Sequence, residues 1–195
     1  MAKTTKGARR RAEKPAAAAP AAPAISLADF RRIPAFSGMN EEDARVFLSH
    51  MTGRPAARGE PILKEGERGE GLYVILQGRV TISKLNAKGG DRDVAVLERH
   101  EVLGEMDLIS DRPHTVGARA RESSLLLFLP RGAFQRLLVE RNPGAIMVVI
   151  YCARMLAGRL DSQNRQMMDV IDGAKKPASS EFSEFKRRLL KDWTF

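Results

Sequence analysis

A chain of 195 residues, 43% of them hydrophobic, is long enough to bury one core, and its formal net charge is +9. Residues 1–24 carry six positive charges and one negative charge, residues 174–195 carry six and three, and the residues between them sum to +1. The basic charge therefore belongs to the two ends, which argues against one broad basic surface on the folded part that would bind nucleic acid or an acidic membrane.

The sequence carries no pattern typical of export. The single cysteine, Cys152, cannot form an intramolecular disulfide, and its apolar neighbours favour a packed helix position in a reducing compartment. Residues 1–23 lack the apolar run of a signal peptide, and Arg154 and Arg159 soon interrupt the run that includes Ile146–Ile150. We therefore expect a cytoplasmic protein without a transmembrane segment.

The first 24 residues, rich in Ala, Pro, Lys and Arg, contain almost nothing large to bury and are predicted to be a disordered arm. Such an arm contacts nucleic acid or acidic lipid, or is a solubilising tail, and we favour the tail. A domain over residues 25–173 follows. It begins with helical patterns at Leu27–Arg32 and Glu41–Met51, the second with Asn40 as its N-cap.

From Arg54 to Leu129 the pattern changes to short apolar and β-branched runs separated by glycine, which is typical of strands joined by tight turns. The predicted strands are Pro61–Lys64, Leu72–Leu76, Arg79–Leu85, Asp93–Leu97 and Leu125–Leu129. Their number and spacing indicate a mainly β fold with flanking helices, a β-roll or jelly roll.

Helical periodicity returns after Leu129. Pro130 precedes a predicted helix over Arg131–Glu140, and Asn142 with Pro143 forms the start of a long helix that runs to about Asp172. An apolar stripe with one polar member follows the helix: Ile146, Val149, Ala153, Leu156, Leu160, Gln163, Met167 and Val170. The stripe either packs on the chain's own β-roll or forms a homodimer seam over residues 146–170.

Residues 174–195 hold a linker and then a short basic amphipathic tail, with Phe182, Phe185 and Trp193 on its apolar side. Such a segment docks on a protein partner or anionic lipid, or folds back on its own domain.

Three runs resemble the opening of the cyclic nucleotide-binding domain, which catabolite activator protein, the regulatory subunits of cyclic-AMP-dependent kinase and gated ion channels share. They are Phe30–Ser37 (FRRIPAFS), Gly59–Gly71 (GEPILKEGERGEG) and Leu72–Val80 (LYVILQGRV). The resemblance extends from Phe30 to Asp172, about three quarters of the chain. It implies a cyclic nucleotide as ligand, most simply cyclic AMP or cyclic GMP.

The run Val102–Ala120 (VLGEMDLISDRPHTVGARA) is similar to the phosphate-binding cassette of that family. The resemblance implies that Glu105 accepts a hydrogen bond from the ribose 2′-hydroxyl, that Thr115 offers its hydroxyl to the phosphate, and that a short helix after Gly104 aims backbone N–H groups at the phosphate. Leu103, Met106, Leu108 and Ile109 are expected to pack the cassette against the roll. The predicted ligand-binding residues of the cassette are Leu103, Gly104, Glu105, Met106, Arg112, His114, Thr115 and Val116.

The sequence departs from the family at His114, where the family has an arginine that binds the cyclic phosphate with two parallel hydrogen bonds. A histidine, with a reference pKa of about 6.5, donates such a charged contact only when protonated. Loss of one charge-assisted hydrogen bond costs roughly 1.5–3 kcal/mol. Three outcomes stay open: weak binding, binding with charge from Arg112, and a protein-interaction scaffold that no longer binds nucleotide.

The resemblance places base-reading residues at Arg159 to Asn164 of the long helix, with Gln163 and Asn164 as candidates. Gln163 is equally typical of a polar residue that sets the register of a coiled coil. The 22 residues beyond Gly173 leave no room for the winged helix-turn-helix of the family's transcription factors, so we expect no sequence-specific DNA binding.

An enzyme is not indicated. His50, His100 and His114 lack metal-ligand spacing, and no Walker or nucleophile-elbow motif is present, so no catalytic residue, metal or cofactor is predicted. The sequence thus predicts a signal-transducing module that binds a cyclic nucleotide and relays that binding to an unidentified protein partner.

Overall fold

The computed structural model describes residues 25–86, 89–110 and 112–173. Two predicted segments, the arm over residues 1–24 and the tail over residues 174–195, lie outside these ranges. The chain divides between Val148 and Val149 into two compact units, which are described separately below.

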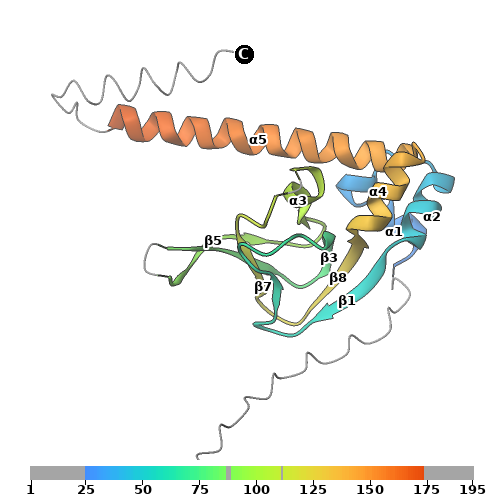
Figure 1. Cartoon of the computed structure of the whole chain (residues 1–195), viewed down its shortest axis with the longest axis horizontal. Helices are drawn as coiled ribbons and strands as arrows, with labels where there is room; N and C mark the ends of the chain where they lie inside the picture. Colours follow the sequence, from blue (N-terminus) through green and yellow to red (C-terminus); the bar gives the residue numbers. More distant parts are fainter. Residues whose placement is uncertain (1–24, 87–88, 111, 174–195) are drawn as a thin grey trace, which may run out of the picture. The chain divides into compact units, whose positions relative to one another are not determined.

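The first unit contains eight strands and most of the helices (Figure 1). Its helices are α1 Leu27–Phe30, the 3-10 helix η1 Pro34–Phe36, α2 Glu41–Ser49, α3 Glu105–Ser110 and α4 Arg131–Val139. Its strands are β1 Thr52–Ala56, β2 Pro61–Leu63, β3 Gly71–Gln77, β4 Val80–Leu85, β5 Asp91–Leu97, β6 Val102–Leu103, β7 Gly117–Ala120 and β8 Ser124–Pro130. Helix α5, Pro143–Gly173, begins in this unit and makes up the described part of the second.

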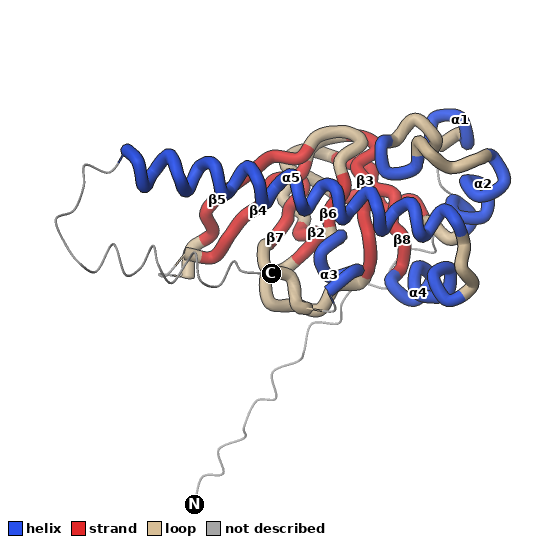
Figure 2. Tube along the Cα trace, turned by 90° about the horizontal axis from the view of Figure 1, so that it is seen from above, coloured by secondary structure: helices blue, strands red, loops and turns tan. Residues whose placement is uncertain are grey.

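The strands form two antiparallel four-stranded sheets, in the orders β1-β8-β3-β6 and β2-β7-β4-β5. Figures 1 and 2 both show α1, α2 and α4 at one end of these sheets and the β4–β5 hairpin toward the other. The predicted fold class, a β-roll with flanking helices followed by a long C-terminal helix, is confirmed.

Three strands were not predicted: β1, β6 and β7. Strand β1 contains Gly53 and Pro55, residues that disfavour a central strand. They are tolerated because β1 lies at the edge of its sheet, beside β8. Strand β7 reads Gly-Ala-Arg-Ala and has no β-branched residue, yet it lies between β2 and β4. Only the pairing partners make these sequences strands.

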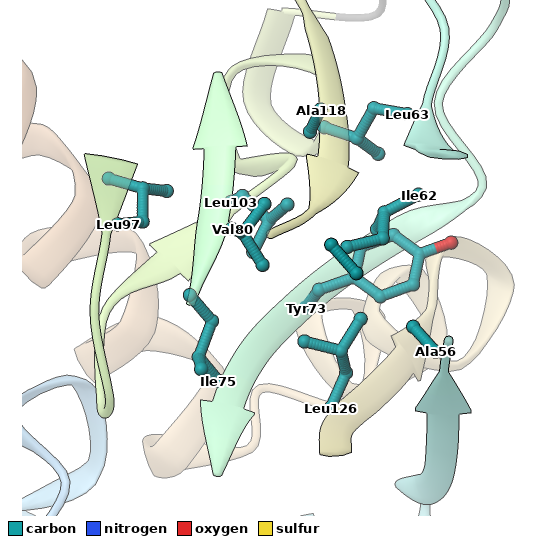
Figure 3. Close-up of a cluster of buried hydrophobic side chains, with 11 residues drawn as sticks. Ala56, Ile62, Leu63, Tyr73, Ile75, Val80, Leu97, Leu103, Ala118 and Leu126 are labelled. Atoms are coloured by element: carbon teal, nitrogen blue, oxygen red, sulfur yellow. The ribbon is translucent and has the colours of Figure 1, made fainter. Parts of the chain in front are cut away.

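The core of the roll fills the space between the two sheets (Figure 3). The first sheet contributes Ala56, Tyr73, Ile75, Leu103 and Leu126, and the second contributes Ile62, Leu63, Val80, Leu97, Ala118 and Ala120. Because successive side chains of a strand point to opposite faces, these residues identify the interior face of each strand except β2, where Ile62 and Leu63 are adjacent and the pairing with β7 is irregular.

Helix starts follow the predicted caps. The Asn40 side chain accepts a hydrogen bond from the Asp43 amide (2.8 Å) at the start of α2, and the Asn142 side chain accepts one from the Ala145 amide (3.1 Å) at the start of α5. Pro143 is the first residue of α5, where its missing N–H costs no helical hydrogen bond.

Tyr73 is the largest side chain of the core that carries a polar group. Its ring stacks on Phe128 (centroids 4.6 Å apart), and its hydroxyl accepts a 2.7 Å hydrogen bond from the Arg54 guanidinium. Burial raises the pKa of Tyr73 to about 12, although the nearby Arg54 charge acts in the opposite direction.

This raised pKa predicts a loss of stability at high pH. The folded state holds the phenolic proton more tightly than the unfolded state, so the contribution of Tyr73 is complete below pH 10 and is lost as the pH rises through 12. Between pH 8 and pH 11 the free energy of unfolding should fall by about 1 kcal/mol more in the parent than in Tyr73→Phe. Urea unfolding of both proteins at the two pH values measures this difference. An equal change in the free energy of unfolding for the two proteins would contradict it.

The apolar stripe predicted along α5 is partly exposed. Ile146 is 45% and Leu160 56% exposed, whereas Val148 and Cys152, on another face of the helix, are buried. The packed helix position expected for Cys152 is therefore confirmed.

The expectation that no segment is long and apolar enough to span a bilayer is wrong by length and composition. The helical stretch Pro143–Asp169 is long enough, and its most apolar part has a mean hydropathy of 1.3 despite the charges of Arg154 and Arg159, with 22% of that part buried. A single helix of this kind is weak evidence for a membrane span, since helices that pack against protein pass the same test.

Candidate functional site

The cassette-like run lies between β6 and β7 and is built around Gly104. Gly104 has φ +83°, and a Cβ atom on it would lie 2.5 Å from the Gly71 carbonyl oxygen of β3. A glycine is needed here for two reasons, the left-handed backbone and the close approach of β3. The backbone then enters α3, where the Leu108 amide donates to the Gly104 carbonyl (3.3 Å).

Gly104→Ala should destabilise the fold by about 3 kcal/mol, because it combines left-handed backbone strain with a backbone clash. Gly59→Ala is the matched control: Gly59 has φ +84° but nothing within 4 Å of the added Cβ, so only the strain of about 1 kcal/mol applies. Thermal or urea unfolding compares the two variants, and equal losses would show that the approach to Gly71 is unimportant.

Glu105, the first residue of α3, is only 4% exposed. A carboxylate is rarely buried unless it is paired or hydrogen-bonded, because its desolvation costs free energy. The burial of Glu105 is therefore a specific feature of this site. Leu103 and Leu108 are also buried, as expected of residues that hold the cassette on the roll. Met106 and Ile109 are 43% and 44% exposed, so the expectation that they pack against the roll is wrong. A helix of six residues offers one face to the roll, and Glu105 and Leu108 occupy it.

His114 is 7% exposed and its backbone is joined to the β2–β3 loop. Its amide donates to the Glu67 carbonyl (2.9 Å), and its carbonyl accepts from the Gly66 amide (2.8 Å). These two bonds hold the residue that replaces the family arginine at the mouth of the roll. Thr115 is exposed and Val116 is half-buried.

Two arginines flank His114 in the sequence, the predicted Arg112 and, five residues after His114, Arg119. Arg112 is exposed. Arg119 forms ion pairs with Asp93 and with Asp91 across the sheet. Since Ala118 and Ala120 face the core, strand alternation turns Arg119 away from the roll interior.

Arg159, Gln163 and Asn164 lie in the second unit, along α5. Arg159 and Gln163 are exposed and Asn164 is half-buried. Their use as base-reading residues stays a prediction.

The sequence analysis missed Lys84 and Glu65. The Lys84 ammonium donates to the Thr115 carbonyl and to Glu65 Oε1 (2.7 Å), and Glu65 Oε2 accepts from the Leu85 amide (2.9 Å). The Leu85 amide first, and then Lys84, lower the pKa of Glu65. The available signal was the alternation of β4, which places Lys84 on the same side as Val80 and Ile82.

Within the described ranges, no group of three or more His, Cys, Asp and Glu side chains is placed to hold a metal ion.

Comparison with known proteins identifies the domain. The family model of the cyclic nucleotide-binding domain matches residues 54–141. The chain is 32% identical over 127 residues to the cyclic AMP receptor protein of Thermus thermophilus, covering 65% of this chain and 57% of that protein. It thus spans little more than half the length of this relative, and 10% of the cGMP-dependent protein kinase of Eimeria tenella that it also matches.

Solved structures agree with this assignment. The Thermus thermophilus catabolite activator protein superimposes with a TM-score of 0.59 at 27% identity, covering 71% of this chain and 63% of that chain. A cyclic nucleotide-binding domain from Methylobacillus flagellatus has a TM-score of 0.64 at 24% identity, covers 79% and 84%, and supports the fold alone. The matched relatives include transcriptional regulators, a cGMP-dependent protein kinase, kinase regulatory subunits and a potassium channel, so the shared domain occurs in regulatory proteins of several kinds. Residues 54–141, which hold most of the β-roll, match the cyclic nucleotide-binding domain family.

Proposed function

We propose that this chain is a cytoplasmic regulatory module that binds cyclic AMP or cyclic GMP through residues 103–116 and relays that binding to a protein partner through α5. The observation that carries the proposal is the buried carboxylate of Glu105, which follows the left-handed Gly104 at the base of the cassette. A buried acceptor at this position suits a ribose 2′-hydroxyl, which donates a hydrogen bond that a deoxyribose lacks.

His114 is one group that would contact the phosphate of the ligand. A protonated imidazole donates a charge-assisted hydrogen bond to an anion, and a neutral one donates a weaker bond. Calorimetric titration of the full chain with cyclic AMP and cyclic GMP at pH 6 and pH 8 tests both the function and this role. Tighter binding at pH 6 supports a protonated His114 at the phosphate, and equal binding at the two pH values assigns the phosphate contact to other groups.

The loss of the family arginine favours a second candidate, a scaffold that keeps the fold and no longer binds nucleotide. In that case the same titrations give no heat at either pH with either nucleotide. Such a result would overturn the binding proposal and leave a protein-interaction role.

The proposed relay runs through the α4–α5 junction. Arg141 adopts a left-handed backbone (φ 56°) between the two helices, and its amide donates to the Leu138 carbonyl (3.0 Å). A non-glycine residue held in this conformation is a strained turn, and such turns are suited to change when a neighbouring segment moves. Closure of the cassette on the ligand would shift α4 and with it the start of α5.

A homodimer through residues 146–170 is part of the proposal, because Ile146 and Leu160 lie on the heptad stripe and are exposed in the single chain. The chain should sediment as a dimer at micromolar concentration, and Leu160→Glu should shift it toward monomer by placing like charges at the seam. Met168→Glu is a control, since Met168 is also exposed on α5 but lies off the stripe. A monomeric mass for the parent chain would remove this part of the proposal.

A further inference from the structure

The mouth of the roll carries a pair of positive charges that the family resemblance does not account for. Val80 and Ile82 of β4 point into or pack against the core, so strand alternation places Lys84 on the same interior face, at the open end. Its cross-strand partner on β5 is Arg92. Like charges directly opposite each other on a sheet are destabilising, so an anion between them would relieve the repulsion.

Lys84 and Arg92 both line a hollow of about 420 Å³ on the β4–β5 hairpin, together with Leu85, Asn86, Asp93 and Val94. The Asp93 carboxylate is paired with Arg119, which offsets its negative charge. Lys84 also reaches the cassette, since its ammonium donates to the Thr115 carbonyl, one residue after His114. Lys84 therefore lines the hollow and also contacts the cassette next to His114, where the family has its arginine.

We propose that Lys84, with Arg92 beside it, supplies the positive charge that holds the phosphate of a nucleotide in this domain, in place of the arginine that His114 replaces. This inference rests on the proposed function. Two nearby arginines, Arg112 and Arg119, suit the role less well. Arg119 faces away from the roll interior and is paired with Asp93, and Arg112 has no strand to hold it in place.

Glu65 controls how available Lys84 is to a ligand. Its side chain is 20% exposed and its carboxylate accepts from Lys84 at 2.7 Å, while the Lys84 side chain is 50% exposed. The Leu85 amide and Lys84 stabilise the ionised form of Glu65 and lower its pKa, so near neutral pH it neutralises Lys84 in the absence of ligand. Removal of the Glu65 charge should therefore strengthen phosphate binding, whereas removal of the Lys84 charge should weaken it.

These opposite expected effects on affinity distinguish a Lys84 that binds the ligand from a Lys84–Glu65 ion pair that only holds the cassette in place. If the Lys84–Glu65 bridge were only structural, loss of either partner would loosen the Thr115 segment and weaken binding. Gln at position 65 keeps an oxygen that can accept from the Leu85 amide, so Glu65→Gln changes the charge with little change in shape.

The experiment is calorimetric titration of the full chain with cyclic AMP and cyclic GMP at pH 8 and two salt concentrations. We expect Lys84→Gln to weaken binding about tenfold and Arg92→Gln to weaken it severalfold, which is the scale of one charge-assisted contact at a partly exposed site. Glu65→Gln should tighten binding about threefold. The Lys84→Gln variant should also lose part of the salt dependence of the parent.

Lys64→Gln is the matched control, because Lys64 pairs with Glu67 (3.3 Å) in the adjacent loop and stays 61% exposed. It should change the affinity less than twofold, and melting temperatures of all variants check that each one folds. Unchanged affinity in Lys84→Gln, or weaker binding in both Lys84→Gln and Glu65→Gln, overturns the inference while the proposed function stands. No binding by the parent chain overturns both.

Discussion

Glu105→Ala is expected to weaken cyclic nucleotide binding by about 10- to 100-fold, the largest effect of any single change in the cassette. The substitution leaves the ribose 2′-hydroxyl without its acceptor inside a site where the parent side chain is only 4% exposed. An unmatched buried polar group costs about 1–3 kcal/mol, which corresponds to this range of affinity. Calorimetric titration of the parent and variant chains with cyclic AMP measures the effect.

The 2′-deoxy analogue of cyclic AMP separates this contact from a general loss of structure. The parent should bind the analogue more weakly than cyclic AMP, and Glu105→Ala should bind the two almost equally. Glu67→Ala is the control, since it removes an exposed carboxylate from the loop whose backbone contacts His114. A variant that still prefers the ribonucleotide as strongly as the parent would show that another group reads the sugar.

His114→Arg is expected to raise the affinity for cyclic nucleotide about tenfold at pH 8. Arginine stays charged at that pH and donates two parallel hydrogen bonds to a phosphate, whereas a histidine donates a charged contact only in its protonated form. The increase in affinity should be at the low end of what one charge-assisted contact gives, because Lys84 already places a positive charge beside Thr115. Titrations from pH 6 to pH 8 should also show less pH dependence for the variant.

His114→Gln is the matched control for the protonation of the imidazole. It keeps a neutral donor at a position that is 7% exposed and cannot gain a charge, so weaker binding than the parent would report a charged contact from the imidazole. If His114→Arg folds and binds no more tightly than the parent at any pH, the side chain at this position does not face the phosphate.

Local sequence determined most of the elements. The caps at Asn40 and Asn142 predicted the starts of α2 and α5 because a side-chain oxygen beside a helical run satisfies an unpaired amide of the first turn. Short apolar and β-branched runs between glycines predicted β3, β4 and β8, and the number and spacing of such runs indicated a β-roll. These signals act within a few residues, so the sequence is enough to read them.

The site was predicted in part. The sequence located Glu105 and the departure at His114, since both lie in one continuous run. The prediction that Met106 and Ile109 pack against the roll was wrong, since both lie on the exposed face of α3. A helix of six residues is too short for its apolar periodicity to define the buried side.

Tertiary structure alone decided which charge stands beside the cassette. Lys84 and Thr115 are 31 residues apart in the sequence and meet through a hydrogen bond between β4 and the loop that precedes β7. Arg119 is closer to His114 along the chain, but the pairing of β7 with β4 turns it outward to Asp93. The sequence names the residue types available for a phosphate site, whereas strand pairing and the side of the sheet on which each side chain falls determine which of them meet, because these depend on contacts between segments that are distant in the chain.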